Sequence, residues 1–265
     1  MTSAELAETI TKKIRQHPKL WGWYGLWSHR SKKLSALFLG FLERDSNSSA
    51  HKENGPHGPP QYWAKNVHLL IPEVAELGLR REVMDRINSI LGKDVLLWSG
   101  HFYSKKVEVH RWHEDVEHRE WNGVTAWIGL SNVGPNSTMK VISGSHLFGT
   151  TPQELAAERG SNLESDGEVL DLARRFSRDA KVVQLDLKPG YFFLFSGRTW
   201  HGSINTSGKR RSAIIFQYCR PDTRVRIPFS YEIPTKWSRA QPWVTLASGE
   251  DRFGVNHVKT RSDQA

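Results

Sequence analysis

The stretch RWHEDVEHREW, residues 111–121, places two histidines and four carboxylates close together. Imidazole nitrogens and carboxylate oxygens are common ligands of transition metals. Four interpretations fit the letters alone: a variant of the HExxH helix of zinc proteases, a metal-binding pair of His113 and Asp115, a pair of His118 and Glu120, or a charged strand end that is simply solvated. The spacing of the residues and their context discriminate among these interpretations.

The zinc-protease interpretation is excluded by geometry. HExxH places its two histidines four residues apart on one helix face, whereas His113 and His118 are five residues apart, which rotates the second imidazole by about 140°. The preceding letters KVEVHRW also alternate between apolar and polar residues, which is typical of a strand. A helical metal site is therefore not expected here.

In a strand, His113 and Asp115 point to the same side, because residues i and i+2 share a face. A third ligand is offered by KPGYFFLFSGRTWHGSINTS, in which an apolar strand is followed by His201. Two neighbouring ligands and a distant histidine fit the 2-His-1-carboxylate triad, which leaves open positions on ferrous iron. His118 and Glu120 stay as a fallback, because no strand leads into them.

An arginine follows the third candidate ligand at a suggestive distance. Ten residues after His201, Arg211 opens the strand RSAIIFQYC. A guanidinium binds a carboxylate through two parallel hydrogen bonds, as the far end of a chelating keto acid requires. Ser203 could add a hydroxyl to the same carboxylate. Arg210 remains an alternative to Arg211, because the turn length sets the phase of the strand.

These residues need a β scaffold, and the sequence predicts one. We expect helices over residues 4–16 and 72–92, and a charged helical insertion at 152–180. Short strand-like segments separated by Gly, Pro and Asn fill the rest of residues 94–220. The fold class is mainly β with flanking helices, a sandwich or jelly roll. The predicted strands are 94–103, 106–115, 124–133, 138–143, 181–187, 191–196 and 211–219.

Composition bounds the partners and the compartment. The 265-residue chain carries a formal net charge of +9, eleven tryptophans and one cysteine, Cys219. No secretory signal and no apolar run long enough to span a membrane is visible, so we expect a cytoplasmic protein without a membrane anchor. Nucleic-acid binding is disfavoured, because the basic residues are scattered and the tryptophans lie in apolar, strand-like runs.

Four stretches together resemble one protein family. RWHED, VTAWIGLSNVGPNSTMKVISGSH, KPGYFFLFSGRTWHGSINTS and KRRSAIIFQYC follow one another in the order found in the phytanoyl-CoA dioxygenase family of iron- and 2-oxoglutarate-dependent oxygenases. The resemblance covers about half the chain, residues 94–220, and implies a double-stranded β-helix, the cupin-like jelly roll. The whole chain is expected to be one oxygenase domain, with a helical N-terminal region at 1–93 and a C-terminal extension at 221–265.

The resemblance also implies roles for single residues. His113, Asp115 and His201 would ligate Fe(II), while Arg211 and Ser203 would bind the distal carboxylate of 2-oxoglutarate. Tyr103 falls where the family has a further contact to this cosubstrate. The sequence departs from the family pattern at Asn136-Ser137-Thr138, where Asn-Gly-Pro is usual, at Tyr191, where an acid is usual, and in a His201–Arg211 spacing that is one residue short.

The implied activity is that of a dioxygenase that uses O2 and 2-oxoglutarate to oxidise a C–H bond of a small molecule. Hydroxylation or another oxygen-type outcome is favoured over chlorination, because related halogenases lack the carboxylate that Asp115 provides; desaturation and ring formation remain alternatives to hydroxylation. The net positive charge favours an anionic substrate, such as a natural-product intermediate. Trp127 is a candidate wall of the substrate pocket, although it could equally pack the core.

Two alternatives use the same residues differently. A cupin-type metalloenzyme would not need 2-oxoglutarate, and HGSIN matches the end of the second cupin motif, but Arg211 would then have no role. A nucleic-acid oxygenase would be expected to carry a second arginine soon after Arg211 on the same strand, and none occurs before Arg220.

Overall fold

The computed structural model describes residues 1–16, 65–106, 108–115, 121–160, 163, 165–228 and 235–259. The chain divides into two compact units. The first consists of Met1–Ala7 and Phe102–Ile215, and the second of Glu8–His101 and Phe216–Ala265. Helix α1 (Ser3–Gln16) and strands β1 (Val95–Lys105) and β8 (Arg211–Cys219) each contribute residues to both units.

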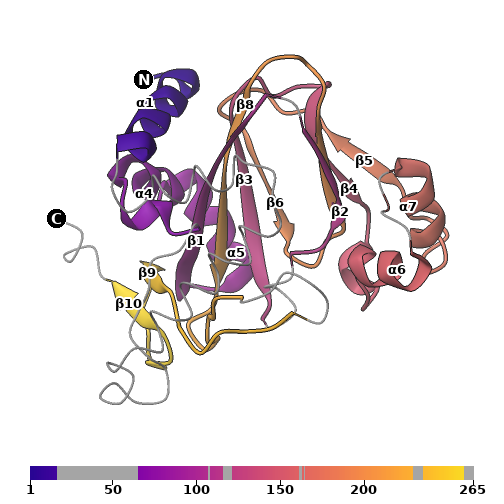
Figure 1. The fold of residues 1–265 in the computed structure, drawn as a ribbon. Helices are drawn as coiled ribbons and strands as arrows, with labels where there is room; N and C mark the ends of the chain where they lie inside the picture. Colours follow the sequence, from indigo (N-terminus) through magenta and orange to yellow (C-terminus); the bar gives the residue numbers. More distant parts are fainter. Residues whose placement is uncertain are drawn as a thin grey trace. The chain divides into compact units, whose positions relative to one another are not determined.

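Two sheets form the first unit (Figure 1). The smaller sheet has the strand order β2-β7-β4-β5, and the first unit's part of the larger sheet has the order β1-β8-β3-β6. Within the smaller sheet, β7 pairs antiparallel with β2 and with β4, and β4 pairs antiparallel with β5. The strands not yet delimited are β2 (Glu108–His113), β3 (Gly123–Ser131), β4 (Ser137–Ile142), β5 (Val182–Leu185), β6 (Phe192–Ser196) and β7 (His201–Asn205).

The interior of this unit lies between the two sheets. One buried cluster joins Trp127 of β3 and Ala213 of β8 with Met139 of β4, and Phe193 and Phe195 of β6 pack against it. Side chains from both sheets therefore share one apolar core, as in a sandwich of two faces. This arrangement confirms the predicted mainly-β jelly-roll fold.

Strand β7 was not predicted from the sequence. It has only five residues, HGSIN, and its polar and glycine content gives no strand signal. The glycine is required by a close approach, since a Cβ at Gly202 would lie 3.1 Å from the carbonyl oxygen of His110 and 3.4 Å from the Trp112 side chain. Tertiary pairing on both edges, with β2 and with β4, stabilises this short strand.

The predicted insertion at 152–180 contains two helices, α6 (Pro152–Arg159) and α7 (Asp166–Ala173). A reciprocal capping box between Thr151 and Glu154 starts α6. The helices pack on a second apolar cluster that includes Trp112 of β2 and Trp200, the residue before β7. A 3-10 turn, η5 (Ser145–Leu147), precedes them and contains His146. The insertion is thus attached to the strands that carry His113 and His201.

In the second unit, the single helix predicted over 72–92 is wrong, because two helices are present. Helix α4 (Pro72–Gly78) ends before Arg80, whose backbone is extended, and α5 (Arg81–Leu91) follows. The hydroxyl of Tyr218 donates a 2.7 Å hydrogen bond to the carbonyl of Gly78. A continuous helix would use that carbonyl for the amide four residues on, so a long-range contact supports the break. Residues Val67–Leu69 form a further 3-10 turn, η3.

The C-terminal region adds strands that the sequence did not predict. Strand β9 (Trp243–Ser248) pairs antiparallel with β1, and β10 (His257–Lys259) pairs parallel with β9. The second unit's part of the larger sheet therefore has the order β10-β9-β1-β8. The single oxygenase domain with a C-terminal extension at 221–265 stays a prediction.

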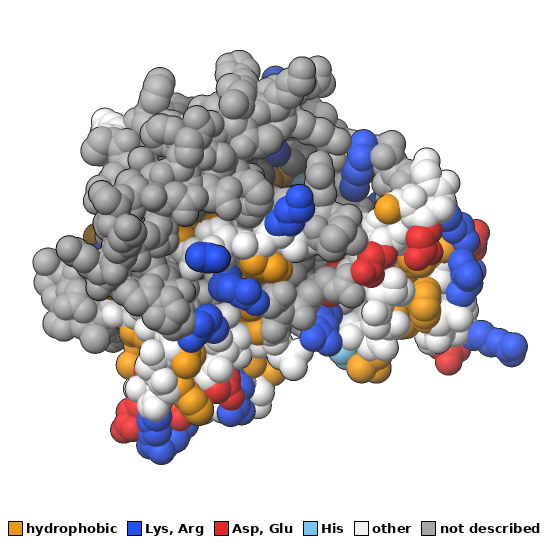
Figure 2. Space-filling model, turned by 60° about the horizontal axis from the view of Figure 1, so that its bottom comes forward, with side chains coloured by type: hydrophobic (Ala, Val, Ile, Leu, Met, Phe, Trp, Pro, Cys, Tyr) orange, Lys and Arg blue, Asp and Glu red, His pale blue; other side chains and the backbone are white. Residues whose placement is uncertain are grey.

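Two expectations from the sequence concern the surface charge and membrane spans: that the basic residues are scattered, and that no segment crosses a membrane. Lys and Arg side chains are spread over the described part of the face in Figure 2, with acidic side chains among them at both sides. No helix within the described ranges is long and apolar enough to cross a membrane.

Candidate active site

The structure brings His113, Asp115 and His201 together. One ligand atom from each residue lies within 4.8 Å of the others. The His201 Nε2 atom is 3.8 Å from Oδ1 of Asp115, and the ring centroids of His113 and His201 are 4.1 Å apart. Two imidazoles and one carboxylate converging on one point are a ligand set suited to non-haem iron.

Strand pairing positions the two histidines. His113 is the last residue of β2 and His201 the first of β7, and the two are direct partners in the antiparallel ladder. Directly opposed residues project to the same face of a sheet. The edge of the His201 ring also packs on Phe195 with ring centroids 4.9 Å apart. The smaller sheet and the apolar core therefore hold both rings.

Asp115 lies just beyond the end of β2. Its backbone amide donates to the carbonyl of Gly197 at 3.1 Å, and its Oδ2 accepts a hydrogen bond from the hydroxyl of Thr125 at 3.2 Å. The sequence pointed to Asp115 but gave no signal for Thr125, whose role depends on how β3 lies beside the loop. An oriented carboxylate is a common outer-shell feature of metal sites.

Backbone contacts favour one nitrogen of each imidazole as the ligand. Nδ1 of His113 is 2.8 Å from the carbonyl of Arg111, and Nδ1 of His201 is 2.7 Å from the carbonyl of Thr199. Because a carbonyl can only accept, Nδ1 carries the proton and Nε2 keeps its lone pair. Burial, followed by the neighbouring His201 and His110, holds the pKa of His113 well below its usual value. A neutral imidazole is the form that binds a metal.

His110 belongs to this region and was missed from the sequence. Its ring packs edge-on against His113 with centroids 4.2 Å apart. In a regular strand, residues three apart face opposite sides, but the pairing of β2 with β7 shifts register between His110 and His113. Desolvation of the imidazole by the surrounding protein, followed by the nearby His201, lowers the pKa of His110 to about 4, although part of the residue is exposed to solvent. A bulge of this kind is not readable from alternation.

Arg211 and Ser203 also come together, as predicted. The guanidinium of Arg211 is buried, with 1% of the residue exposed. Its Nη2 donates to Oγ of Ser203 at 2.9 Å, and its Nη1 donates to the carbonyls of Thr138 and Ile204 at 3.2 Å each. These bonds fix the orientation of the guanidinium without neutralising its charge. A buried cation of fixed orientation suits an anionic ligand.

Three further side chains surround the guanidinium. Its Cζ lies 5.3 Å from the ring centroid of Tyr103 and 5.9 Å from that of Trp127. The Tyr103 hydroxyl is buried and has no hydrogen-bond partner among the described residues. Lys105, which the sequence did not single out, places Nζ 5.3 Å from the same Tyr103 ring. Burial, followed by Arg211, lowers the pKa of Lys105. The surroundings of Arg211 are thus aromatic and cationic.

Asn205 ends β7 and ties this end of the sheet together. Its side-chain amide lies within hydrogen-bonding distance of the carbonyls of Lys105, Lys106 and Lys209, at 3.1, 2.8 and 3.0 Å. Asn205, the last residue of the HGSIN stretch, therefore links the chain at Lys105 and Lys106 to the turn before Arg211. These hydrogen bonds account for the asparagine without a role in binding a ligand.

The remaining predicted residues lie elsewhere. Arg210 is exposed, and its Nη1 donates to the carbonyl of Ser104 at 3.0 Å. His118 and Glu120 fall outside the described residues. Glu114, which stands between His113 and Asp115, is buried with 6% exposure. Trp127 is buried at 3% within the apolar cluster between the sheets, so it packs the core while one face approaches Arg211.

Comparison with known proteins decides the family. The family model described as phytanoyl-CoA dioxygenase matches residues 6–213. The chain belongs to the phytanoyl-CoA dioxygenase family. Membership confirms the enzyme class, a 2-oxoglutarate-dependent non-haem iron oxygenase, and with it the expected Fe(II), 2-oxoglutarate and O2. A search of curated proteins found no match.

Solved structures agree with this fold. The apo form of ThoJ, a non-heme monooxygenase, is 18% identical with a TM-score of 0.52, over 85% of this chain and 79% of ThoJ. CytC3, solved with Fe(II) and alpha-ketoglutarate, is 17% identical with a TM-score of 0.50, over 87% of this chain and 85% of CytC3. For a member of the phytanoyl-CoA dioxygenase family, a His-Asp-His cluster in which His201 is buried and His113 and Asp115 are partly exposed is chemically appropriate for iron.

Proposed function

We propose that this family member hydroxylates an unactivated C–H bond of a small-molecule substrate and releases succinate and CO2. The observation that carries the proposal is the convergence of His113, Asp115 and His201 in the same compact unit as the buried Arg211–Ser203 pair. The triad would hold Fe(II) through Nε2 of each histidine and a carboxylate oxygen. When bound, the iron supplies the oxidising chemistry with O2 and 2-oxoglutarate.

The chain's own residues would bind and orient the cosubstrate. Arg211 would bind its distal carboxylate, with Ser203 holding the guanidinium in place. The buried Tyr103 hydroxyl, which has no hydrogen-bond partner among the described residues, would donate to the same carboxylate and so satisfy its hydrogen-bonding capacity. Trp127 and Phe193, stacked at 5.7 Å, exclude water from this end.

Hydroxylation is favoured over chlorination because Asp115 occupies the carboxylate position and is held there by Thr125. A halogenase of this family needs that position open for chloride. For the substrate, we propose a small molecule with a carboxylate or phosphate, such as a natural-product intermediate. The support is the net charge of +9 and the half-buried Lys105 near Arg211.

Succinate formation tests this function. The purified protein with Fe(II), O2 and 2-oxoglutarate is assayed against a panel of anionic small metabolites, and we expect iron-dependent succinate that rises with one class of substrate. Asp115→Ala removes a ligand and is expected to lower the rate to that of the metal-free protein. Asp186→Ala, at an exposed aspartate, is the matched control. No succinate with any substrate, together with unchanged metal binding in Asp115→Ala, contradicts the proposal.

A further inference from the structure

One side chain outside the predicted site holds the backbone between two proposed ligands. The backbone amide of Glu114 donates to Oε1 of Gln153 at 3.0 Å, and Nε2 of Gln153 donates to the carbonyl of Glu114 at 2.7 Å. Glu114 stands between His113 and Asp115. Both hydrogen-bonding groups of that residue's backbone are therefore satisfied by a single amide side chain from the insertion.

Strand pairing in the sheet does not satisfy the backbone amide and carbonyl of Glu114. Strand β2 ends at His113, its last partner in β7 being His201. Beyond that point the chain leaves the ladder, yet the carboxylate of Asp115 must still be placed within a few tenths of an ångström for a metal site. The Gln153 amide acts as a substitute partner where the strand pairing stops.

Gln153 lies near the start of helix α6, which is held in place by its N-terminal cap and by apolar packing. It is the second residue of α6, after Pro152 and between the two members of the Thr151–Glu154 capping box. Leu155 is buried with Trp112 and Trp200 in one cluster, and the Trp200 indole donates to the carbonyl of Thr150 at 2.9 Å. The helix carrying Gln153 is therefore packed against the residues that precede both histidine ligands.

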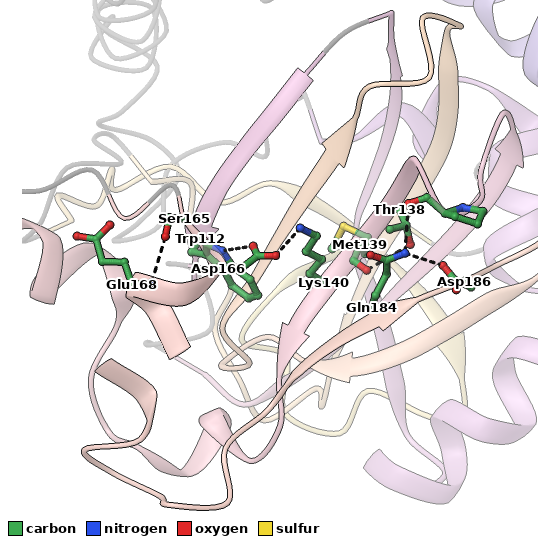
Figure 3. Close-up of polar contacts among 10 residues, drawn as sticks. Trp112, Thr138, Met139, Lys140, Ser165, Asp166, Glu168, Gln184 and Asp186 are labelled. Carbon is green, nitrogen blue, oxygen red and sulfur yellow. Dashed lines mark hydrogen bonds and ion pairs between the residues drawn. The ribbon is translucent and has the colours of Figure 1, made fainter. Parts of the chain in front are cut away.

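The second insertion helix attaches to the same strand (Figure 3). Asp166, in the first turn of α7, accepts hydrogen bonds from the Trp112 indole at 3.3 Å and from Lys140 of β4 at 2.5 Å. Trp112 directly precedes His113. Contacts from α6 and from α7 thus flank the ligand-bearing end of β2 on both sides of His113.

We infer that Gln153 is a positioning residue for the metal centre. The insertion at 152–180 would hold the backbone around His113 and Asp115 in place through Gln153 and Asp166. The inference rests on the proposed function, since it concerns the triad that would bind iron. Only a side chain with both a donor and an acceptor at this length completes the paired bonds, so glutamine fits where glutamate or asparagine does not. Loss of hydrogen bonds that orient metal ligands typically weakens metal binding about 10- to 100-fold, and Gln153 would act on the two neighbouring ligands through the backbone of Glu114.

The test is anaerobic titration of the apo-protein with Fe(II), without 2-oxoglutarate, in wild type, Gln153→Met and Gln153→Glu. Methionine keeps the length and removes both hydrogen bonds, so we expect the dissociation constant to rise about 10-fold or more. Gln184→Met is the matched control, because Gln184 is exposed on β5 and bonds Pro135 and Asp186. It should bind Fe(II) like wild type.

Two further outcomes separate the possibilities. Should Gln153→Met fail to fold, Gln153→Glu keeps the acceptor and adds a negative charge that attracts a cation, so any loss of affinity reports geometry. Equal affinity of wild type and folded Gln153→Met, or of wild type and folded Gln153→Glu at an ionic strength that screens the added charge, overturns the positioning role even if the melting temperature is lowered, and leaves the function intact. A wild-type protein that binds no Fe(II) overturns the proposed function as well.

Discussion

At the scale of the residue, the proposed binding of 2-oxoglutarate depends on the guanidinium of Arg211. Arg211 is buried and oriented by Ser203 and by two backbone carbonyls, whereas the adjacent Arg210 is exposed. The two arginines are neighbours in sequence with opposite environments. Each can therefore serve as the control for the other.

Replacing Arg211 by lysine is expected to weaken 2-oxoglutarate binding about 10- to 100-fold, because a point charge cannot make the paired hydrogen bonds of the guanidinium. Fe(II) affinity should change little, since Arg211 is not one of the three proposed ligands and lysine keeps its positive charge. Anaerobic titration of the Fe(II)-loaded protein with 2-oxoglutarate measures the effect. Arg210→Lys should bind like wild type, and the reverse pattern would assign the role to Arg210.

The sequence pointed to the three candidate ligands because alternation in a strand and a histidine after a distant apolar strand are visible in the sequence, and the structure brings these residues together. It did not reveal His110 or Gln153. His110 reaches the site through a register shift in β2, and Gln153 through helix docking thirty-nine residues after Glu114. Such contacts depend on tertiary packing, and tertiary packing leaves no local pattern in the sequence.

At the scale of the element, too, features with a local sequence pattern were predictable and features set by long-range contacts were not. The seven strands with apolar alternation or apolar runs were predictable, whereas β7 is too short and polar, and exists because both neighbours pair with it. The predicted helix over 72–92 splits because Tyr218, far along the chain, bonds the carbonyl of Gly78. Local propensity favoured one helix, and a long-range contact decided otherwise.

The 3-10 turn η3 contributes a pH dependence of stability. His68 is buried at 1% against Gly100, and burial lowers its pKa from 6.5 to about 3. The unfolded chain therefore binds a proton at a higher pH than the folded one. The stabilisation is complete above pH 6.5 and is lost as the pH falls toward 3, at about 1.4 kcal/mol per pH unit for one such histidine.

His68→Phe should remove this contribution, because phenylalanine has a similar ring and no titrating nitrogen. Denaturant unfolding between pH 6 and pH 4 should show a slope of unfolding free energy against pH that is shallower by about 1.4 kcal/mol per unit. His146→Phe, at an exposed histidine, serves as the control and should keep the wild-type slope. An unchanged slope in His68→Phe would show that His68 is protonated in the folded protein.

At the scale of the whole molecule, the first compact unit contains every residue assigned to iron and 2-oxoglutarate. The two sheets contribute His113, His201 and Arg211, Asp115 follows the end of β2, and the insertion contacts Trp112 and Glu114 on either side of His113. The family and the enzyme class follow from the match over residues 6–213.

The most direct test is anaerobic addition of 2-oxoglutarate to the Fe(II)-loaded protein, followed by visible absorption. Chelation of iron by the keto acid should produce a charge-transfer band that saturates at one 2-oxoglutarate and one Fe(II) per chain. His201→Ala should lose both the bound iron and the band, while His146→Ala, outside the triad, should retain both. A full band in His201→Ala, or no band in wild type, would contradict the assignment of His113, Asp115 and His201 as the iron site.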